Sequence, residues 1–512
     1  MSTRTIAAAA SRPSPLPSQL QSLVALHECL TADYLEQHAL LPLTLEDGVL
    51  MTATWRDVDA QAIDDLALLF EAEVRLVELP EHDVRAAIRR MYGDDATTAR
   101  EVIDALTSET SLTIEQEIPL DDLVHLANEA PVVKLVNLLV LEALESRASD
   151  VHLEGYADGL RVRYRIDGVL QEAPAPPPDL TAAIISRLKI MAELDIAERR
   201  VPQDGRIRLR LQDRQVDVRV STLPTLRGES VVLRLLDTEG GRISLEQLGM
   251  APDTLSRFAD IITRPHGIVL ATGPTGSGKT TTLYAAVDHI RTGREKILTV
   301  EDPVEYQLAG VPQVAVNEKV GVTFATALRA LLRQDPDVML VGEIRDGETA
   351  EIATQAALTG HLVLSTLHTN DAAGALTRLL DLGIAPYLVS STVEAVLAQR
   401  LLRVICAECR TTRALEASER RELGVGAQDI CSVSYGEGCA ACRGTGFRGR
   451  LGVYELLVMS EELRQELVAG RSAAELRRLA MTHGMRTLRD DGVRLVRQGT
   501  TTVEEVLRAT RG

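Results

Sequence analysis

The sequence predicts an α/β protein built around a mainly parallel sheet that helices cover on both faces. Four short apolar runs in the second half of the chain are separated by helical patterns, which is the arrangement of parallel strands joined by crossover helices. The strand candidates are Ile268–Thr272, Ile297–Glu301, Val338–Gly342 and Leu362–Thr366. Each run ends in polar residues, so ligands are expected at the carboxyl ends of these strands.

A glycine-rich segment after the first strand candidate fills the phosphate-loop pattern G-x-x-x-x-G-K-[ST] at every fixed position. Glycines let backbone N–H groups approach phosphate oxygens, and the following helix adds partial positive charge at its N-terminus. Lys279 is expected to bridge the terminal phosphates, and the Thr280 hydroxyl to ligate Mg²⁺. A bare glycine turn, the alternative, requires neither residue. The predicted nucleotide-binding residues are Gly273, Pro274, Thr275, Gly276, Ser277, Gly278, Lys279, Thr280 and Thr281.

Two acidic segments follow the second and third strand candidates. Glu301-Asp302-Pro303-Val304-Glu305 ends one, and Gly342-Glu343-Ile344-Arg345-Asp346 ends the other. Parallel strands bring both to the edge that holds the phosphate loop, where Mg²⁺ and an attacking water need carboxylates. We assign Glu343 to holding Mg²⁺ through water and Glu305 to orienting or deprotonating the attacking water, although the two roles are exchangeable. Solvated loop carboxylates are the alternative interpretation.

Two histidines bracket the fourth strand candidate. His368 falls at its carboxyl end, near the expected γ-phosphate, and is a candidate for reporting the nucleotide state through a hydrogen bond. His361 begins the same strand. A lone histidine at a strand end is more often structural, and His361 is the weaker candidate of the two.

Six cysteines in a chain without a signal peptide favour a metal site over disulfides. Cys406-x-x-Cys409 and Cys439-x-x-Cys442 form two pairs of the kind that complete a tetrahedral zinc site. Buried thiols without metal and a redox pair are the alternatives. A site with four protein ligands has no open position, so its expected role is to stiffen a subdomain. Cys29 and Cys431 have no partner spacing.

Composition narrows the classes of function. The formal net charge is −19 and only 3% of residues are aromatic, so binding to nucleic acid is not expected. No stretch approaches the roughly 18 uninterrupted apolar residues of a membrane-spanning helix, and the N-terminus lacks the pattern of a signal peptide. A cytoplasmic protein is expected.

The chain is predicted to contain several domains. An α-rich N-terminal domain spans residues 1–110, with a flexible lead-in to about residue 16 and a helical pattern from Leu20 to Tyr92, including Ala60–Phe70 and Val84–Met91. The sequence favours neither of two roles for this domain, a packing module or a docking module. The further predicted parts are an acidic linker at 111–130, a mixed α/β domain at 131–240, the sheet domain at 241–403, a tetracysteine subdomain at 404–448 and a helical part at 449–512.

The domain at 131–240 is predicted to carry arginines on one face of a sheet. A helix from Pro131 to Ser146 precedes a series of short alternating runs. The run Leu160–Ile166 alternates strictly, places three arginines on one face and ends in an Asp167-Gly168 turn. The other strand candidates are Val151–Glu154, Ile207–Leu211, Val216–Val220 and Val231–Leu235.

These motifs together resemble the secretion ATPase superfamily, most closely the E-type ATPases of bacterial type II secretion, which are related to the pilus-assembly ATPases. The segments that carry the resemblance are GPTGSGKTTTLYA, ILTVEDPVEY, LRALLRQDPDVMLVGEIRD, TGHLVLSTLHTNDA and the four cysteines, in that order. The resemblance implies a RecA-like ATPase core, a preceding mixed α/β (PAS-like) domain and a zinc-binding subdomain. It matches Glu305 and Glu343 to the family's two catalytic glutamates, and His361 and His368 to its paired histidines.

The resemblance also implies cofactors and partners. ATP, Mg²⁺ and Zn²⁺ are expected, together with a homo-hexamer in which arginines of the preceding domain reach the nucleotide. Residues that match this role lie in Asp204-Gly205-Arg206, Asp217-Val218-Arg219 and Arg227-Gly228-Glu229, with Arg234 following. Arg206 and Arg219 are the candidates, because a planar guanidinium stabilises charge on a transferring phosphoryl group; solvated sheet-face arginines are the alternative. The N-terminal domain is expected to dock on an inner-membrane assembly protein, which makes the association with the membrane peripheral.

The implied function is ATP hydrolysis that powers assembly of a secretion pseudopilus. The nearest alternative is a type IV pilus extension ATPase, which shares every motif named above. A retraction motor is disfavoured because that branch usually lacks the tetracysteine segment. A nucleic-acid translocase and a nucleotide-gated scaffold are the remaining alternatives, and salt-dependent polynucleotide binding or negligible phosphate release would identify them.

Overall fold

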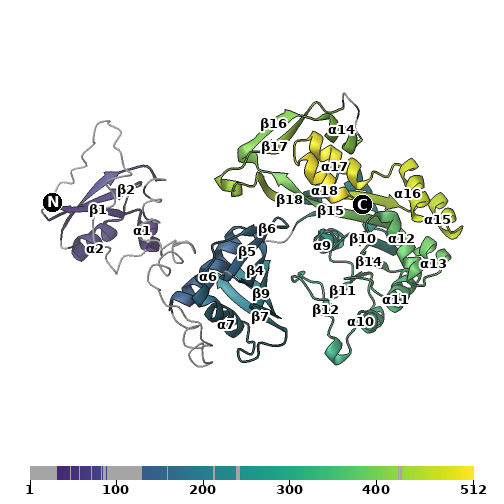
Figure 1. Cartoon of the computed structure of the whole chain (residues 1–512), viewed down its shortest axis with the longest axis horizontal. Helices are drawn as coiled ribbons and strands as arrows, with labels where there is room; N and C mark the ends of the chain where they lie inside the picture. The colour runs from purple at the N-terminus through teal and green to yellow at the C-terminus, as the bar shows by residue number, and fades with distance from the viewer. Residues whose placement is uncertain are drawn as a thin grey trace. The chain divides into compact units, whose positions relative to one another are not determined.

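The computed structural model describes most of the chain beyond residue 130 and parts of the region before it. The described residues are 32–46, 48–56, 58–70, 72–81, 84, 88, 130–157, 159–211, 214–237, 243–424, 426 and 429–511. They fall into two compact units, 1–109 and 110–512, which are described separately (Figure 1). The predicted lead-in, Cys29, most of Val84–Met91 and nearly all of the predicted linker at 111–130 lie outside the described residues.

The first unit contains a small sheet packed with helices. Its elements are α1 (Ala32–His38), β1 (Leu41–Glu46), β2 (Val49–Thr54), α2 (Ala60–Phe70) and β3 (Glu73–Glu78). The sheet has the order β1-β2-β3, with β1 and β2 antiparallel and β2 and β3 parallel. Leu35, Leu50, Leu66 and Ile88 are fully buried in its core.

The helical interpretation of Leu20–Tyr92 is correct for α1 and α2 and wrong for the three strands. Leu41, Leu43 and Leu45 alternate with other residues before Asp47-Gly48, and a short apolar run follows it, which is the signal of a hairpin rather than of a helix. Gly48 has φ 75°, a conformation that suits glycine at such a turn. The N-terminal unit is therefore mixed α/β.

The second unit begins with a six-stranded antiparallel sheet in the order β6-β5-β4-β9-β8-β7. Its elements are α6 (Ala130–Glu145), β4 (Ala148–Tyr156), β5 (Gly159–Ile166), β6 (Val169–Glu172), α7 (Thr181–Met191), β7 (Gln203–Leu211), β8 (Arg214–Thr225) and β9 (Gly228–Asp237). The predicted helix and the predicted strands are confirmed. Asp167 and Gly168 both have positive φ, 49° and 84°, as the turn between β5 and β6 requires.

One face of this sheet is apolar and packs under the helices. Tyr164 is 1% exposed, and its hydroxyl donates to the Leu139 carbonyl of α6 at 3.1 Å. Because side chains alternate along a strand, Arg163 and Arg165 project from the opposite face. The predicted arginine-bearing face is therefore the one that the helices leave uncovered.

The third part is built on a seven-stranded sheet in the order β12-β11-β13-β14-β10-β15-β18. Its strands are β10 (Gly267–Thr272), β11 (Ile297–Glu301), β12 (Gln313–Ala315), β13 (Val338–Val341), β14 (Leu362–Leu367), β15 (Val393–Ile405) and β18 (Phe447–Val458). All neighbours are parallel except β15 and β18. The four strands predicted from their apolar runs are confirmed, and so is the mainly parallel sheet.

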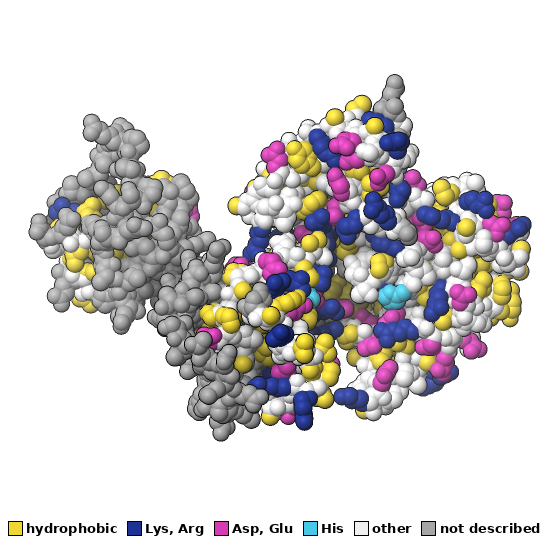
Figure 2. Space-filling model, viewed as in Figure 1, with side chains coloured by type: hydrophobic (Ala, Val, Ile, Leu, Met, Phe, Trp, Pro, Cys, Tyr) yellow, Lys and Arg dark blue, Asp and Glu magenta, His cyan; other side chains and the backbone are white. Residues whose placement is uncertain are grey.

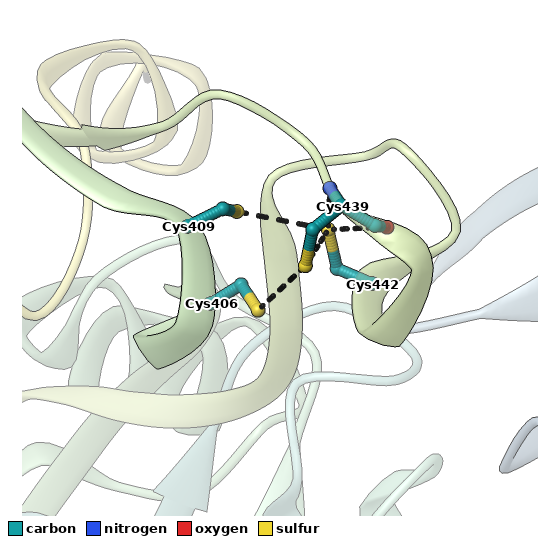
Figure 3. A group of neighbouring side chains, drawn as sticks. All are labelled: Cys406, Cys409, Cys439 and Cys442. Atoms are coloured by element: carbon teal, nitrogen blue, oxygen red, sulfur yellow. Dashed lines mark hydrogen bonds between the residues drawn. The ribbon is translucent and has the colours of Figure 1, made fainter. Parts of the chain in front are cut away.

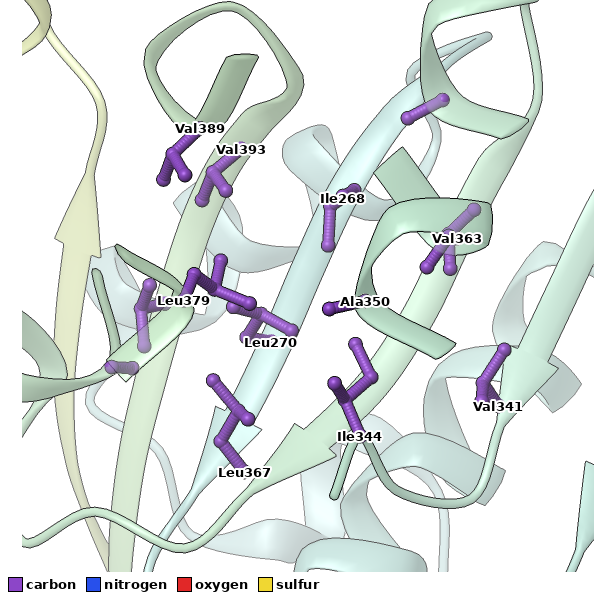
Figure 4. Close-up of a cluster of buried hydrophobic side chains, with 14 of the residues drawn as sticks. Ile268, Leu270, Val341, Ile344, Ala350, Val363, Leu367, Leu379, Val389 and Val393 are labelled. Carbon is purple, nitrogen blue, oxygen red and sulfur yellow. The ribbon is translucent and has the colours of Figure 1, made fainter. Parts of the chain in front are cut away.

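Helices cover both faces of this sheet. They are α8 (Pro252–Ile262), α9 (Lys279–Ile290), α10 (Phe324–Leu331), α11 (Gly347–Leu358), α12 (Ala372–Asp381) and α13 (Pro386–Thr392). On one face, Ile268 and Leu270 of β10 pack against Ala350 of α11 and Leu379 of α12 (Figure 4). On the other face, Val269 of β10 joins the cluster of α8 and α9. The core strands are buried on both faces, as a doubly covered parallel sheet requires.

The C-terminal region surrounds the long β15–β18 hairpin. Its elements are β16 (Arg410–Ala414), α14 (Ala417–Leu423), β17 (Ser432–Gly436), α15 (Glu461–Val468), α16 (Ala473–Thr482), α17 (Leu488–Arg497) and α18 (Val503–Thr510). Helices of this region return to pack on β15 and β18, so the predicted helical part shares a core with the sheet. Among the described residues, none of the helices has the length and apolar character needed to cross a bilayer.

Candidate functional site

The phosphate loop has the backbone that its sequence predicts. Gly273, Gly276 and Gly278 have φ of 148°, 77° and 89°, and α9 begins directly after Gly278. A β-carbon at Gly273 would lie 2.6 Å from the Gln399 carbonyl oxygen, which is closer than packing permits. The loop is thus a tight turn that ends in a helix N-terminus, where backbone N–H groups favour an anion.

Lys279 lies over this turn. Its ammonium donates to the carbonyl oxygens of Gly273 at 2.7 Å and Pro274 at 3.2 Å. Burial lowers the pKa of Lys279 to about 8, against the opposing charge of Glu343 and with a contribution from Arg400. The lysine is therefore held in a partly desolvated position in which a phosphate would be a favourable partner.

A cleft of about 1160 Å³ opens above the loop. All the predicted residues from Pro274 to Thr281 line it, and Gly273 lies buried at the end of β10. The buried hydroxyl of Ser277 has no hydrogen-bond partner among the described residues, an unsatisfied polar group of the kind that a phosphate oxygen relieves. The fit of these residues to a bound nucleotide is therefore good. Charged side chains of both signs gather around this hollow in the space-filling view (Figure 2).

The two predicted carboxylates both reach the cleft. Glu343 follows β13 and is 14% exposed; it pairs with Arg345, and His368 Nε2 lies 3.4 Å from its Oε2. Glu305 follows β11 and is 39% exposed. The parallel order β11-β13-β14-β10 carries both acidic segments, His368 and the phosphate loop to one edge of the sheet.

The two histidines occupy opposite ends of β14. His368 stands at the carboxyl end beside Glu343 and lines the cleft. His361 precedes the strand, and its Nδ1 lies 2.9 Å from the Ala356 carbonyl oxygen and 3.1 Å from the Thr359 hydroxyl. His361 therefore closes the C-terminal end of α11, away from the phosphate loop.

The arginine face of the antiparallel sheet is turned toward this edge. In the ladder, Arg206 lies opposite Arg219, and Arg219 lies opposite Arg234, so the three form a row across β7, β8 and β9. Arg219 reaches the acidic segment: one guanidinium nitrogen lies 3.3 Å from the Val304 carbonyl oxygen and 4.0 Å from Glu305 Oε2. Arg206 is directed toward its own sheet, with Nε 2.8 Å from Asp217 Oδ1.

Arg234, one of the arginines matched to the nucleotide site, lines the cleft together with Asp150 and with Arg165, which sequence reasoning did not assign to it. Arg234 Nε lies 2.9 Å from Asp150 Oδ1, and Arg165 lies 3.7 Å from the other carboxylate oxygen. Burial opposes ionisation of Asp150, but hydrogen bonds from Ser149 and Arg234 outweigh it and lower the pKa of this carboxyl. Strand register brings these residues together, and alternation within one strand does not reveal register.

The four predicted cysteines converge at a second site (Figure 3). Cys406 and Cys409 flank a short turn after β15, and Cys439 and Cys442 lie on a turn before β18. The Sγ distances are 3.9 Å for Cys406–Cys439, 3.8 Å for Cys409–Cys442 and 3.7 Å for Cys439–Cys442. A tetrahedron with zinc–sulfur bonds of about 2.3 Å places its sulfurs about 3.8 Å apart, so the geometry fits zinc.

Backbone N–H groups donate hydrogen bonds to these sulfurs and stabilise the thiolate form that binds a cation. The N–H groups of Gly438 and Gly446 lie 3.3 Å from Cys409 Sγ and 3.2 Å from Cys442 Sγ. Burial disfavours the thiolate of Cys442, yet the N–H groups of Cys439 and Gly446 outweigh it and lower the pKa to about 6. Cys431 is exposed and lies outside this cluster.

Protein families and curated proteins that are similar to this chain belong to bacterial secretion and pilus systems. Residues 125–508 match the family described as type II/IV secretion system protein, and residues 10–98 match the MshEN domain. The chain is 46% identical over 500 residues to type II secretion system protein E of Pseudomonas aeruginosa, covering 97% of this chain and 99% of the relative. It is 46% identical to type II secretion system ATPase E of Vibrio cholerae over 85% of this chain and 87% of the relative. It is 44% identical to the type IV pilus assembly ATPase PilB of Myxococcus xanthus, over 92% and 84% respectively.

Solved structures share the architecture. The pilus retraction motor PilT with bound ADP is similar with a TM-score of 0.50 and 26% identity, over 73% of this chain and 96% of that one. The ATPase DotB of Legionella pneumophila is similar with a TM-score of 0.55 and 20% identity, over 78% and 98%. At that identity, the second likeness concerns the fold alone.

Proposed function

The chain belongs to the family of type II/IV secretion system proteins and is a secretion ATPase; on this premise we propose how its residues hydrolyse ATP and what the hydrolysis drives. The observation that carries the mechanism is the convergence of Lys279, Glu343 and Glu305 at one sheet edge, with Arg219 beside Glu305. Each of these groups has the charge that a different part of a phosphoryl transfer requires.

The phosphate loop binds and orients the triphosphate. Backbone N–H groups at the start of α9 face the phosphates, and the Lys279 ammonium exchanges its two carbonyl partners for phosphate oxygens. Thr280 and, through water, Glu343 are the groups that would hold Mg²⁺, which supplies charge neutralisation at the β- and γ-phosphates. His368 responds to the nucleotide state through its contact with Glu343.

Glu305 orients the attacking water and accepts its proton. Its carboxylate stands partly exposed at the cleft, and Arg219 lies within 4.0 Å of it. As negative charge develops on the transferred phosphoryl group, the Arg219 guanidinium is positioned to stabilise it. Asp150 accepts a hydrogen bond from Arg234 and lies within ion-pair distance of Arg165, which keeps both arginines on the same face.

Two arginines of one ladder row provide a matched test. Arg219→Ala is expected to lower ATP turnover by roughly 100-fold, because it removes charge stabilisation from the transition state. Arg206→Ala removes an arginine one strand away whose guanidinium is already paired with Asp217, and a change within about threefold is expected. Phosphate release at saturating ATP measures both, with Glu305→Gln as the reference for loss of the base. Equal losses in the two arginine variants would contradict the assignment of Arg219.

We further propose that the chain is a homo-hexamer that powers pseudopilus assembly, held at the cytoplasmic face of the inner membrane by an assembly-platform protein. The full-length likeness to protein E of Pseudomonas aeruginosa supports this partner class. The N-terminal unit is the proposed docking part. Full-length protein is expected to co-sediment with membranes that contain the platform, and a chain lacking residues 1–109 is expected to remain in the supernatant. Sedimentation of both chains alike would overturn the docking proposal.

A type IV pilus extension ATPase is the second candidate, favoured by the 44% identity to PilB of Myxococcus xanthus. The two functions use the same hydrolysis and differ in the platform that is bound. Exchanging the N-terminal unit for that of a pilus ATPase, and asking which platform then retains the hybrid, distinguishes them. Retention by the pilus platform before the exchange would favour the second candidate.

A further inference from the structure

A polar network lies at the beginning of the acidic segment that carries Glu305. Its centre is Glu301, the last residue of β11, which is 3% exposed. The Glu301 carboxylate accepts hydrogen bonds from the Tyr284 hydroxyl, from the Thr299 hydroxyl at 2.7 Å and from Gln313 Nε2 at 3.0 Å. A buried carboxylate is costly unless it is satisfied in this way, so the network has a defined geometry.

Tyr284 links this network to the phosphate loop. It lies on α9, five residues after Lys279, and is fully buried. Its ring meets that of Tyr306 edge to face, with centroids 4.6 Å apart. Burial and the neighbouring Glu301 raise the pKa of Tyr284 far above its usual range. The tyrosine therefore donates to Glu301 and packs on Tyr306, the residue that follows Glu305.

Gln313 fixes the other side of the same loop. Its Nε2 lies 3.2 Å from the Tyr306 carbonyl oxygen and 3.4 Å from the Tyr284 hydroxyl, and its Oε1 accepts from the Leu308 N–H at 2.7 Å. The segment that follows Glu305 is thus attached at two backbone atoms to Gln313 of β12, and the Tyr306 ring packs on Tyr284 of α9.

The exposure of Glu305 makes these attachments consequential. Its side chain is 39% exposed, so packing around the carboxylate contributes little to its position. The backbone beside it is held by Gln313, which donates to the Tyr306 carbonyl, and the Tyr306 ring packs on Tyr284 of the helix that follows the phosphate loop. Displacement of a catalytic group by about 1 Å costs on the order of 100-fold in rate.

We propose that Tyr284, Glu301 and Gln313 are positioning residues that hold Glu305 in register with the phosphate loop. This inference rests on the proposed role of Glu305 as the group that orients the attacking water. The three residues act through the loop that bears Glu305, and the buried side chains of Tyr284 and Glu301 form part of the cleft wall behind it. Satisfying buried polar groups is the alternative role, and it requires no effect on Glu305.

Tyr284→Phe tests the proposal because it removes one hydroxyl and keeps the ring that packs on Tyr306. The expected result is a fall in kcat of about 10-fold with the KM for ATP changed less than about twofold, because only transition-state positioning is lost. Tyr164→Phe is the matched control: that buried hydroxyl also contacts a glutamate, Glu142 at 3.3 Å, but lies in the antiparallel sheet domain. Its kcat is expected to stay within about twofold of the unaltered protein. Gln313→Met provides a second variant with the same expected direction.

A double-mutant cycle separates positioning from a general structural defect. In a Glu305→Gln background, Tyr284→Phe is expected to have no further effect on turnover, because the group that it positions has already been neutralised. A full 10-fold loss in that background, or unchanged kcat in the single Tyr284→Phe variant, overturns the proposal. Unchanged turnover in Glu305→Gln alone instead overturns the proposed function of Glu305, so the two failures are distinguishable.

Discussion

Lys279→Ala is expected to reduce ATP turnover by at least about 100-fold while leaving the fold intact. The ammonium is the cation that projects from the phosphate loop itself, and its hydrogen bonds are to the loop carbonyls of Gly273 and Pro274. Its removal deprives the β- and γ-phosphates of a fixed positive charge without opening the core. Phosphate release measures the loss, and the thermal unfolding midpoint, expected to change little, reports on the fold.

The pKa of Lys279 supplies an independent readout of the same residue. At about 8 in the nucleotide-free protein, this pKa leaves the ammonium charged at pH 7 and increasingly neutral above pH 8. Nucleotide affinity is therefore expected to fall as the pH rises from 7 to 9, and that dependence is expected to disappear in Lys279→Ala. Retained turnover in Lys279→Ala would contradict the assignment of the phosphate loop.

Local sequence patterns were sufficient to predict the core of the ATPase domain and the cysteine cluster. The four core strands, the phosphate loop and the tetracysteine cluster each depend on residues that are close in sequence or on a spacing that metal geometry fixes. Parallel pairing then predicts that Glu305, Glu343 and His368 share an edge, and all three line the cleft. These parts were predictable because sequence order and spatial order coincide at the ends of parallel strands.

Long-range register explains what could not be predicted. Arg206 and Arg219 have similar sequence surroundings, yet Asp217 engages the first while the second reaches Val304 across 85 positions of sequence. The network of Tyr284 and Gln313 likewise joins three elements that no motif connects. In the N-terminal unit the error had a different cause, since the alternation around Gly48 was available in the sequence and a helical period was chosen for it.

We propose that the four cysteines bind zinc, and removal of the metal is then expected to unfold the subdomain that the site closes. Structural zinc contributes about 10–16 kcal/mol in small metal domains, far more than the two short turns that bear the cysteines supply by themselves. Cys439→Ser is expected to lower zinc content from one equivalent per chain to less than about 0.2 and to increase hydrogen exchange between Cys406 and Phe447. Elemental analysis and exchange measured on the same sample check both results.

Cys431→Ser is the matched control, because Cys431 is exposed and outside the cluster. It is expected to keep the full zinc content, and a zinc content of less than about half an equivalent in the unaltered protein would contradict the site.

The effect of Cys439→Ser is expected to extend beyond the subdomain. Near the start of β18, which follows the turn with Cys439 and Cys442, the Gly449 N–H donates to Asp167 at 2.8 Å, and Asp167 directly follows the strand that bears Arg165. Loss of the metal is therefore expected to loosen the arginine face over the nucleotide cleft and to lower turnover, although all four cysteines lie outside the residues that line it.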